Sequence, residues 1–237
     1  MITRAVLATL FVGLFTGLII TAVQQWRVVP LIIAAEAYEG ETPEVHDHAA
    51  VKSNVSLVTP AYAHSAGEAL GPLGLSRLGD TVLANLVTYS GFALLLFGVS
   101  TLFGRQITLT SAVAWGACGW LAVHFLPAVG LPPELPGFPA AELQARQIWW
   151  VATVIMSGAG LALLALKEGV AFKLGALVLI VLPHVFGAPQ PTEIATAVPA
   201  LYAAEYSVAA LTASLIAWLV LALGLGMANE RLAKAEA

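Results

Sequence analysis

Charged residues are scarce in this sequence. Only 10% of its 237 residues are Asp, Glu, Lys or Arg, whereas 59% are hydrophobic. Soluble domains carry roughly 25% charged residues, so this composition excludes a soluble globular domain of the same length. It predicts instead an all-α integral membrane protein that crosses the bilayer several times.

Motifs for nucleotide use and for zinc-dependent hydrolysis are also missing. The sequence contains neither the phosphate-binding loop G-x-x-x-x-G-K-[ST] nor the H-E-x-x-H pair. We therefore expect a protein that is not an enzyme, holds no tight cofactor, binds neither nucleotide nor nucleic acid, and does not itself use ATP. The sequence also has a single cysteine, Cys118, and one cysteine cannot form an intrachain disulfide.

Six apolar runs approach the roughly 20 residues that a membrane-spanning helix needs. We expect a polytopic bundle with spans at about 5–23, 82–104, 109–127, 148–166, 170–187 and 207–228. The fifth run is short and contains Pro183. The alternative is that it forms a half-inserted helix, which leaves five spans in total. The first run follows Arg4 and is expected to be retained, although the small residues at 34–37 also suit signal-peptide cleavage.

Long and short connections alternate along the chain. Residues 36–80 form a polar, acidic loop after the first span, and short turns at 105–108 and 167–169 predict antiparallel hairpins. The connection at 128–147, between the third and fourth spans, is expected to be a stiff, non-helical cap. Proline fixes φ and removes a backbone donor, and five prolines lie in or beside this stretch: Pro127, Pro132, Pro133, Pro136 and Pro139.

The charges predict which side faces the cytoplasm. Six of the ten Lys and Arg residues lie on the side that holds both termini, packed into short segments, and cytoplasmic segments carry such an excess. Eleven of the 14 acidic residues lie on the opposite side. We therefore expect both termini in the cytoplasm and an acidic outer face that concentrates cations.

All five histidines fall on this predicted outer side. Imidazole is a common ligand of Co²⁺, Ni²⁺ and Zn²⁺, so these residues are candidate metal ligands. His46, His48 and His64 lie in the first long loop, where His46 and His48 flank Asp47. The same residues also fit a solvated polar loop that binds no specific ion.

His124 and His184 are expected at the outer ends of the third and fifth spans. An ionisable side chain within a span is costly and indicates function by default. Each lies within three residues of a proline, Pro127 or Pro183, which bends a helix and frees carbonyl groups. We predict that the two imidazoles approach each other beneath the cap and share an ion with Glu134. Two helix-capping histidines at the membrane surface are the alternative.

The cap and its return into the membrane also resemble a known family. The residues Gly130-Leu-Pro-Pro-Glu-Leu-Pro-Gly137, followed by Arg146-Gln-Ile-Trp-Trp150 and preceded by His124, resemble the CbtA-type probable cobalt transporter subunits. Further resemblance lies at 24–30, 74–87, 91–95 and 183–189.

This resemblance implies a membrane subunit of a cobalt uptake system. It also implies a small partner subunit of the CbtB type, with one span and a histidine-rich tail. Ligand chemistry alone would accept Ni²⁺ or Zn²⁺ as readily as Co²⁺. The alternative function is a membrane scaffold that binds metal, or a haem held by His124 and His184, without transport.

Overall fold

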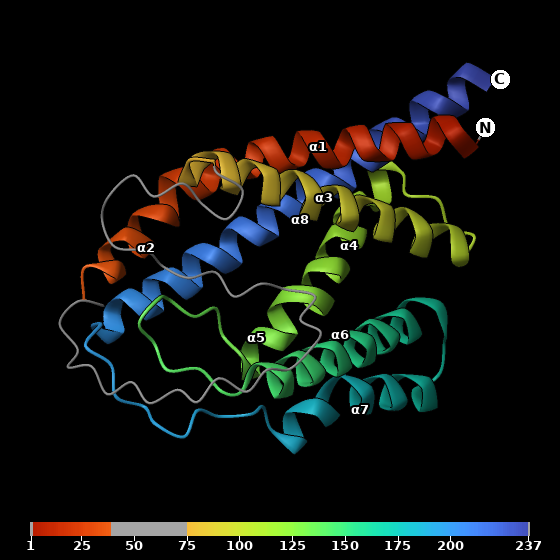
Figure 1. Ribbon diagram of the computed structural model, residues 1–237. Coiled ribbons are helices and arrows are strands. Elements are labelled where there is room, and N and C mark those ends of the chain that lie inside the picture. Colours follow the sequence, from red (N-terminus) through yellow and green to blue (C-terminus); the bar gives the residue numbers. More distant parts are fainter. Residues whose placement is uncertain (1, 39–74, 237) are drawn as a thin grey trace.

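The computed structural model describes residues 2–38 and 75–236, and all regular structure within them is helical (Figure 1), which confirms the predicted all-α class. The helices are α1 (Ile2–Arg27), α2 (Val29–Glu36), α3 (Arg77–Leu102), α4 (Leu109–Trp120), α5 (Leu126–Gly130), α6 (Leu143–Leu166), α7 (Val170–Phe186) and α8 (Ala200–Glu236). A π-helical turn, η2 (Leu121–Phe125), joins α4 to α5.

Five helical units in the described residues are long and apolar enough to cross a membrane: α1, α3, the continuous run from α4 to α5, α6 and α8. The chain is therefore a multi-pass membrane protein. Helix α7 corresponds to the predicted fifth span and is shorter, with 17 residues. At 1.5 Å per residue it extends about 26 Å.

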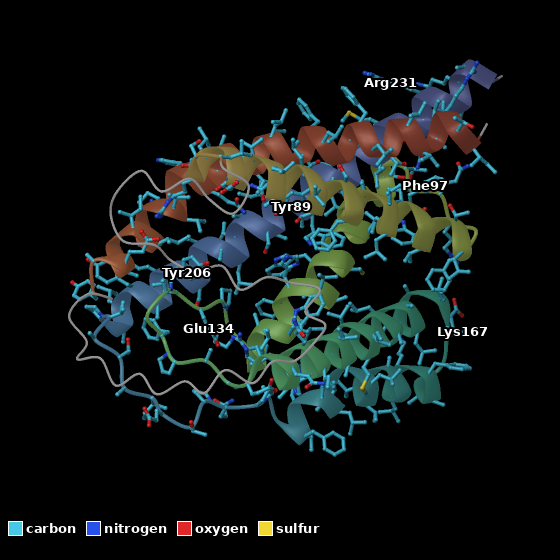
Figure 2. All side chains as sticks on the ribbon, viewed as in Figure 1. Tyr89, Phe97, Glu134, Lys167, Tyr206 and Arg231 are labelled. Atoms are coloured by element: carbon cyan, nitrogen blue, oxygen red, sulfur yellow. The ribbon has the colours of Figure 1, made fainter. Side chains whose placement is uncertain are left out.

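Both ends of the chain lie at the same end of the helical bundle, on the side that also carries the turns 103–108 and 167–169 (Figure 1). We call this the terminal end. The opposite end carries the non-helical residues 131–142, and we call it the cap end. Figure 2 shows Lys167 and Arg231 at the terminal end and Glu134 at the cap end.

Small residues set the close packing between helices. In α1, a Cβ atom added at Gly13 would lie 2.6 Å from the Cα atom of Ser90, and one added at Gly17 would lie 2.9 Å from the carbonyl oxygen of Asn85. The Gly13-x-x-x-Gly17 pattern therefore brings α1 directly against the backbone of α3. Asn85 is buried there and donates hydrogen bonds to Thr21 and Gln24 of α1.

Helix α8 is the longest and packs against α1, α3 and α4. Near the terminal end, the Glu230 carboxylate accepts a hydrogen bond from the Leu109 N–H, 2.9 Å away, at the first residue of α4. Asn229 donates to the carbonyl of Ile107 at 2.9 Å. The first bond satisfies a backbone N–H that a helix start leaves unpaired, and together the two bonds fix α4 to α8.

Helices α6 and α7 form a hairpin beside the rest of the bundle. Gly160 of α6 faces Ala176 and Ile180 of α7 so closely that an added Cβ would lie 2.7 Å from the Ile180 side chain. On its other side α6 packs against η2, α5 and α4. Helix α6 thus stands between η2 and α7 (Figure 1).

The expected non-helical cap at 128–147 is too long, because residues 128–130 belong to α5 and residues 143–147 belong to α6. Pro127 lies in α5, because the preceding turn widens to a π-helix in which the Leu126 N–H bonds to the carbonyl of Leu121. A wider turn relieves the clash between the proline ring and the carbonyl four residues before it. The other four prolines of the cap lie within residues 131–142, which are not helical, as predicted.

Candidate functional site

His124 lies inside the helical bundle. It belongs to η2, and the last residue of α5, Gly130, lies six positions later, which corresponds to about 9 Å of helix. From the sequence, His124 was expected at the outer end of its span. The difference arises because the π-turn lets the helix continue through Pro127 instead of ending there.

The ring of His124 is held by an indole. The Nε1–H of Trp218, in α8, donates to Nδ1 of His124 over 3.0 Å. The ring of Phe92, in α3, meets His124 edge-on at a centroid distance of 5.7 Å and packs on Trp218 at 5.1 Å. Elements η2, α3 and α8 therefore build this cluster together.

The space for Trp218 is provided by glycine. Its side chain is almost fully buried, and an added Cβ at Gly119 of α4 would lie 2.2 Å from the indole ring. A Cβ at Gly116 would lie 2.8 Å from the carbonyl oxygen of Trp218. Only residues without a side chain allow α4 to lie this close to the tryptophan.

His184 has a different environment. It lies in the last turn of α7, two residues before Phe186, and its ring meets Trp149 of α6 edge-on at 5.8 Å. The indole of Trp149 donates to the carbonyl of Pro183, not to the histidine. The Nε2 atom of His184 is buried and has no hydrogen-bond partner among the described residues.

Glu134 lies in the cap and forms an ion pair with Arg146, near the start of α6. The distance between its Oε2 and the Arg146 Nη1 is 2.6 Å, and both side chains are about one-third exposed. Leu135, the next residue, is buried against Ala35 and Val198. This small apolar cluster holds the cap against α2 and the segment before α8.

A cavity of about 360 Å³ lies beneath the cap. Among the described residues Glu134 is the one acidic residue that lines it. Ser207 of α8, which donates to the carbonyl of Pro133 over 3.1 Å, is another polar group there. The remaining lining is mainly proline and small apolar residues. The cap end therefore offers a carboxylate in a partly enclosed space.

Glu142 has a structural role at the start of α6. Its carboxylate accepts hydrogen bonds from the N–H groups of Gln144 and Ala145, and these bonds lower the pKa of Glu142 below its usual value. This arrangement is an N-cap, and an acidic residue directly before an apolar helix is its sequence signal. Glu142 is thus committed to the helix start.

The predicted site residues are not gathered in one place. Within residues 2–38 and 75–236 no group of three His, Cys, Asp or Glu side chains is arranged to hold a metal ion. The shared site of His124, His184 and Glu134 is therefore not formed, because the two rings face different tryptophans and Glu134 is paired with Arg146. His46, His48 and His64 lie outside the described residues.

Trp218 and Phe92 were not predicted from the sequence. Each is one apolar residue among many in its helix, and no motif surrounds it. The available signal is general: a buried indole N–H needs an acceptor, and His124 is a side chain of another span that can provide one. The choice between the six tryptophans of the chain depends on how the helices rotate against each other, which a hydropathy pattern does not give.

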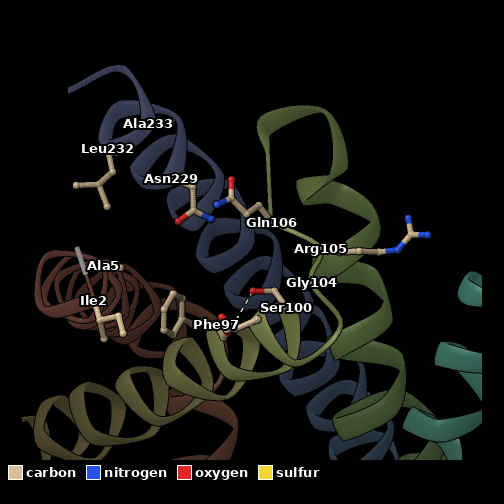
Figure 3. Close-up of a pocket in the computed structure, with 11 residues that line it drawn as sticks. Ile2, Ala5, Phe97, Ser100, Gly104, Arg105, Gln106, Asn229, Leu232 and Ala233 are labelled. Carbon is tan, nitrogen blue, oxygen red and sulfur yellow. Dashed lines mark hydrogen bonds between the residues drawn. The ribbon is translucent and has the colours of Figure 1, made fainter. Parts of the chain in front are cut away.

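A second cavity of about 410 Å³ lies at the terminal end, where α1, α3 and α8 meet (Figure 3). Its polar lining includes Ser100, Arg105, Gln106 and Asn229, and it contains no acidic residue and no histidine among the described residues. Ser100 donates its hydroxyl to the carbonyl of Phe97 at 2.8 Å. The Arg105 side chain points away from the other lining residues (Figure 3), and within the described part of the chain the cavity has no strong metal ligand.

Comparison with known families covers nearly all of the chain. Residues 2–230 match the family described as probable cobalt transporter subunit (CbtA). No curated protein and no solved structure matches the chain. Since the match runs from the first residue of α1 to residue 230 in α8, the chain is a member of the CbtA family of probable cobalt transporter subunits.

Proposed function

We propose that this chain is the membrane subunit that takes Co²⁺ from the cap end of the bundle and passes it to the terminal end. The observation that carries this proposal is the family match over residues 2–230. The family supplies cobalt as the ion, since the imidazoles would accept Ni²⁺ or Zn²⁺ equally well. The cap end then faces outward from the bacterial inner membrane, and both termini are cytoplasmic.

The charge distribution supports this orientation. Lys167 and Arg231 lie at the terminal end, and Glu134 lies at the cap end (Figure 2). Cytoplasmic segments are enriched in Lys and Arg. Six crossings, including α7, would place both termini on this cytoplasmic side. An ion moving inward gains about 2.3 kcal/mol per elementary charge for each 100 mV of membrane potential, and a dication gains about twice that.

The separation of the histidines suits transport through successive weak contacts. A permeating ion must bind well enough to enter and weakly enough to leave. In this proposal His46, His48 and His64 raise the ion concentration outside, Glu134 attracts the ion beneath the cap, and His184 and His124 each provide one imidazole in turn.

The two cavities support the direction of movement. Beneath the cap the ion meets the carboxylate of Glu134, whereas the described lining of the cavity at the terminal end has no acidic or histidine ligand. The carboxylate attracts a cation at the first position, and no described anionic group does so at the second. Binding is therefore strongest on the side of capture and weakest on the side of release.

A partner subunit completes the proposed system. The family description is that of a subunit, and we propose a CbtB-type partner with one span and a histidine-rich tail. No motif for ATP use occurs in this chain. We therefore propose passive or partner-assisted movement of the ion along the membrane potential.

The alternative of a non-transporting scaffold has less support in the geometry. A haem held by His124 and His184 would need both rings to reach one iron from opposite faces. Nδ1 of His124 is instead bonded to Trp218 of α8, and the ring of His184 packs on Trp149 of α6. A scaffold would bind metal but would not change the cobalt content of cells.

Accumulation of radioactive Co²⁺ in cells tests the proposal. Cells that make this chain with its partner should accumulate more Co²⁺ than cells that make the partner alone. His124→Ala and His184→Ala should each reduce the initial rate, and Val185→Ala, a change at an exposed neighbour of His184, should not. Metal binding to membranes without any accumulation would support the scaffold and contradict transport.

A labelling experiment tests the orientation separately. In a Cys118→Ala background, Ala140→Cys in the cap should react with a membrane-impermeant maleimide in intact cells. Glu168→Cys, in the exposed turn between α6 and α7, should react only after the cells are opened. Reaction of both positions in intact cells would mean that α6 does not cross the membrane as proposed.

A further inference from the structure

The hydrogen bond between Trp218 and His124 determines which nitrogen of the histidine carries a proton. An indole N–H can only donate, so the Nδ1 atom of His124, 3.0 Å away, must be the acceptor. A neutral imidazole has one protonated nitrogen. In this structure the proton of His124 therefore lies on Nε2.

This arrangement leaves His124 without a free lone pair. A histidine binds a metal through an unprotonated nitrogen whose lone pair points at the ion. Here the Nδ1 lone pair is used by Trp218, and Nε2 holds the proton. His124 can bind a metal through Nδ1 only after the indole N–H has left that atom.

We propose that Trp218 controls metal binding by His124, blocking it in the arrangement seen here and permitting it when the two side chains separate. This inference rests on the proposed function, because it concerns the access of the transported ion to His124. It assigns Trp218 as a positioning residue and makes the present arrangement the closed state of the pathway.

The packing around Trp218 decides which side chain moves. The indole is enclosed by Phe92 and by the glycine surface at Gly116 and Gly119, so its rotation would require α4 and α8 to separate. His124 instead belongs to the π-turn η2. Such a turn holds one residue more than the α-helix, and it is often found at functional sites.

A change in η2 would therefore move the histidine and leave the tryptophan in place. If the π-turn moves to another position along the helix, the side chains between its old and new positions rotate about the helix axis. The rotation equals the angle between successive residues, roughly 100°. That rotation takes the His124 ring away from Trp218. Pro127, which the π-turn accommodates, maintains η2 at this position.

The competing explanation is purely structural: the histidine only satisfies a buried indole N–H. Trp218→Phe distinguishes the two, because it removes the donor and keeps an aromatic ring. Trp120→Phe is a matched control. The Trp120 indole also lies between α4 and α8, but it donates to the carbonyl of Leu211 and to the hydroxyl of Ser214.

The experiment uses the full-length chain in detergent, purified without a histidine tag, with the other four histidines changed to alanine so that His124 remains. Nitrogen NMR of the labelled imidazole should show the proton on Nε2 in the presence of Trp218. Titration with Co²⁺ should show binding about fivefold tighter for Trp218→Phe, since a neutral hydrogen bond contributes about 1 kcal/mol and about 1.4 kcal/mol corresponds to tenfold. Trp120→Phe should leave the affinity unchanged.

Pro127→Ala provides a second variant in case Trp218→Phe does not fold. It allows a regular α-helix in place of η2, and it should shift the tautomer signal and also tighten Co²⁺ binding. Equal affinity in all these proteins, or a proton on Nδ1 of the parent protein, would overturn the role of Trp218.

The outcomes also separate this inference from the proposed function. If His124→Ala reduces Co²⁺ uptake but Trp218→Phe does not tighten binding, transport stands and the control by Trp218 is refuted. If Trp218→Phe tightens binding but His124→Ala does not change uptake, Trp218 controls a binding site that lies outside the transport pathway, and the proposed role of His124 in transport is refuted.

Discussion

His124 and His184 have similar surroundings in the sequence and different ones in the structure. Each lies within three residues of a proline, and each packs edge-on against an aromatic ring. Near His124 the indole donates to the imidazole, whereas near His184 it donates to the carbonyl of Pro183. One histidine is therefore bonded inside the bundle, and the other lies close to a helix end with an Nε2 atom that no described residue contacts by a hydrogen bond.

The position of the proline explains this difference. Pro127 follows His124, and the π-turn before it lets the helix continue and keeps the histidine beside α8. Pro183 precedes His184, and α7 ends at Phe186, two residues after the histidine. The same two residue types thus produce an interior contact in one helix and a terminus in the other.

The largest expected effect comes from filling the space beside Trp218. Gly119→Ala would place a Cβ 2.2 Å from the indole ring, and overpacking of this kind costs about 1–3 kcal/mol. Thermal unfolding in detergent should show the loss, and the hydrogen bond to His124 should weaken with it. Gly158→Ala, where an added Cβ meets no atom within 4 Å, should be neutral or slightly stabilising.

The next effect compares the two histidines directly. His124→Ala leaves the buried N–H of Trp218 without an acceptor, at a cost of about 1–3 kcal/mol. His184→Ala removes an Nε2 atom that has no hydrogen-bond partner among the described residues, so it should reduce the free energy of unfolding by less. Equal losses in chemical denaturation would show that the hydrogen bond to Trp218 contributes little.

A smaller effect is expected in the cap. The pair between Glu134 and Arg146 is about one-third exposed, and exposed ion pairs usually contribute under about 1 kcal/mol. Glu134→Gln should therefore change stability little, but it should lower Co²⁺ uptake at low metal concentration and leave the saturated rate unchanged. A lower saturated rate would place Glu134 in the rate-limiting part of the pathway.

The smallest effect concerns pH. Hydrogen bonds from Gln144 and Ala145 lower the pKa of Glu142 in the folded protein, so its stabilising effect is present above the ordinary pKa of 4.5 and is lost as the pH falls through the lower folded value. Unfolding measured between about pH 6 and about pH 3, a range that includes the ordinary pKa of a Glu carboxyl, should depend less on pH in Glu142→Gln. An unchanged pH profile would show that this N-cap does not form.

Much of the fold follows from hydropathy. The six apolar runs correspond to helices, and the short fifth run became the shortest of them, because length and apolar content report directly on burial in lipid. The Gly13-x-x-x-Gly17 pattern, which brings α1 against α3, can likewise be read from local sequence. These features depend on local sequence alone.

The candidate site follows the sequence less closely. The π-turn at η2 and the contact between Trp218 and His124 arise from the way α4 and α8 pack. As a result, His124 lies deeper in the bundle than the sequence predicted and contacts residues that were not predicted. Glu134 was predicted as a metal ligand without reference to Arg146, twelve residues later, which the fold brings beside it. Rotation of one helix against another decides such contacts.

The central claim is that the described histidines act as separate contacts and not as one closed site. X-ray absorption at the cobalt edge tests it most directly, on Co²⁺-loaded protein in which His46, His48 and His64 are changed to alanine. The account predicts a shell of oxygen ligands with one imidazole per cobalt, which is lost when His184 is also changed to alanine. Two imidazoles on the same cobalt ion would show that His124 and His184 converge, and would contradict the account.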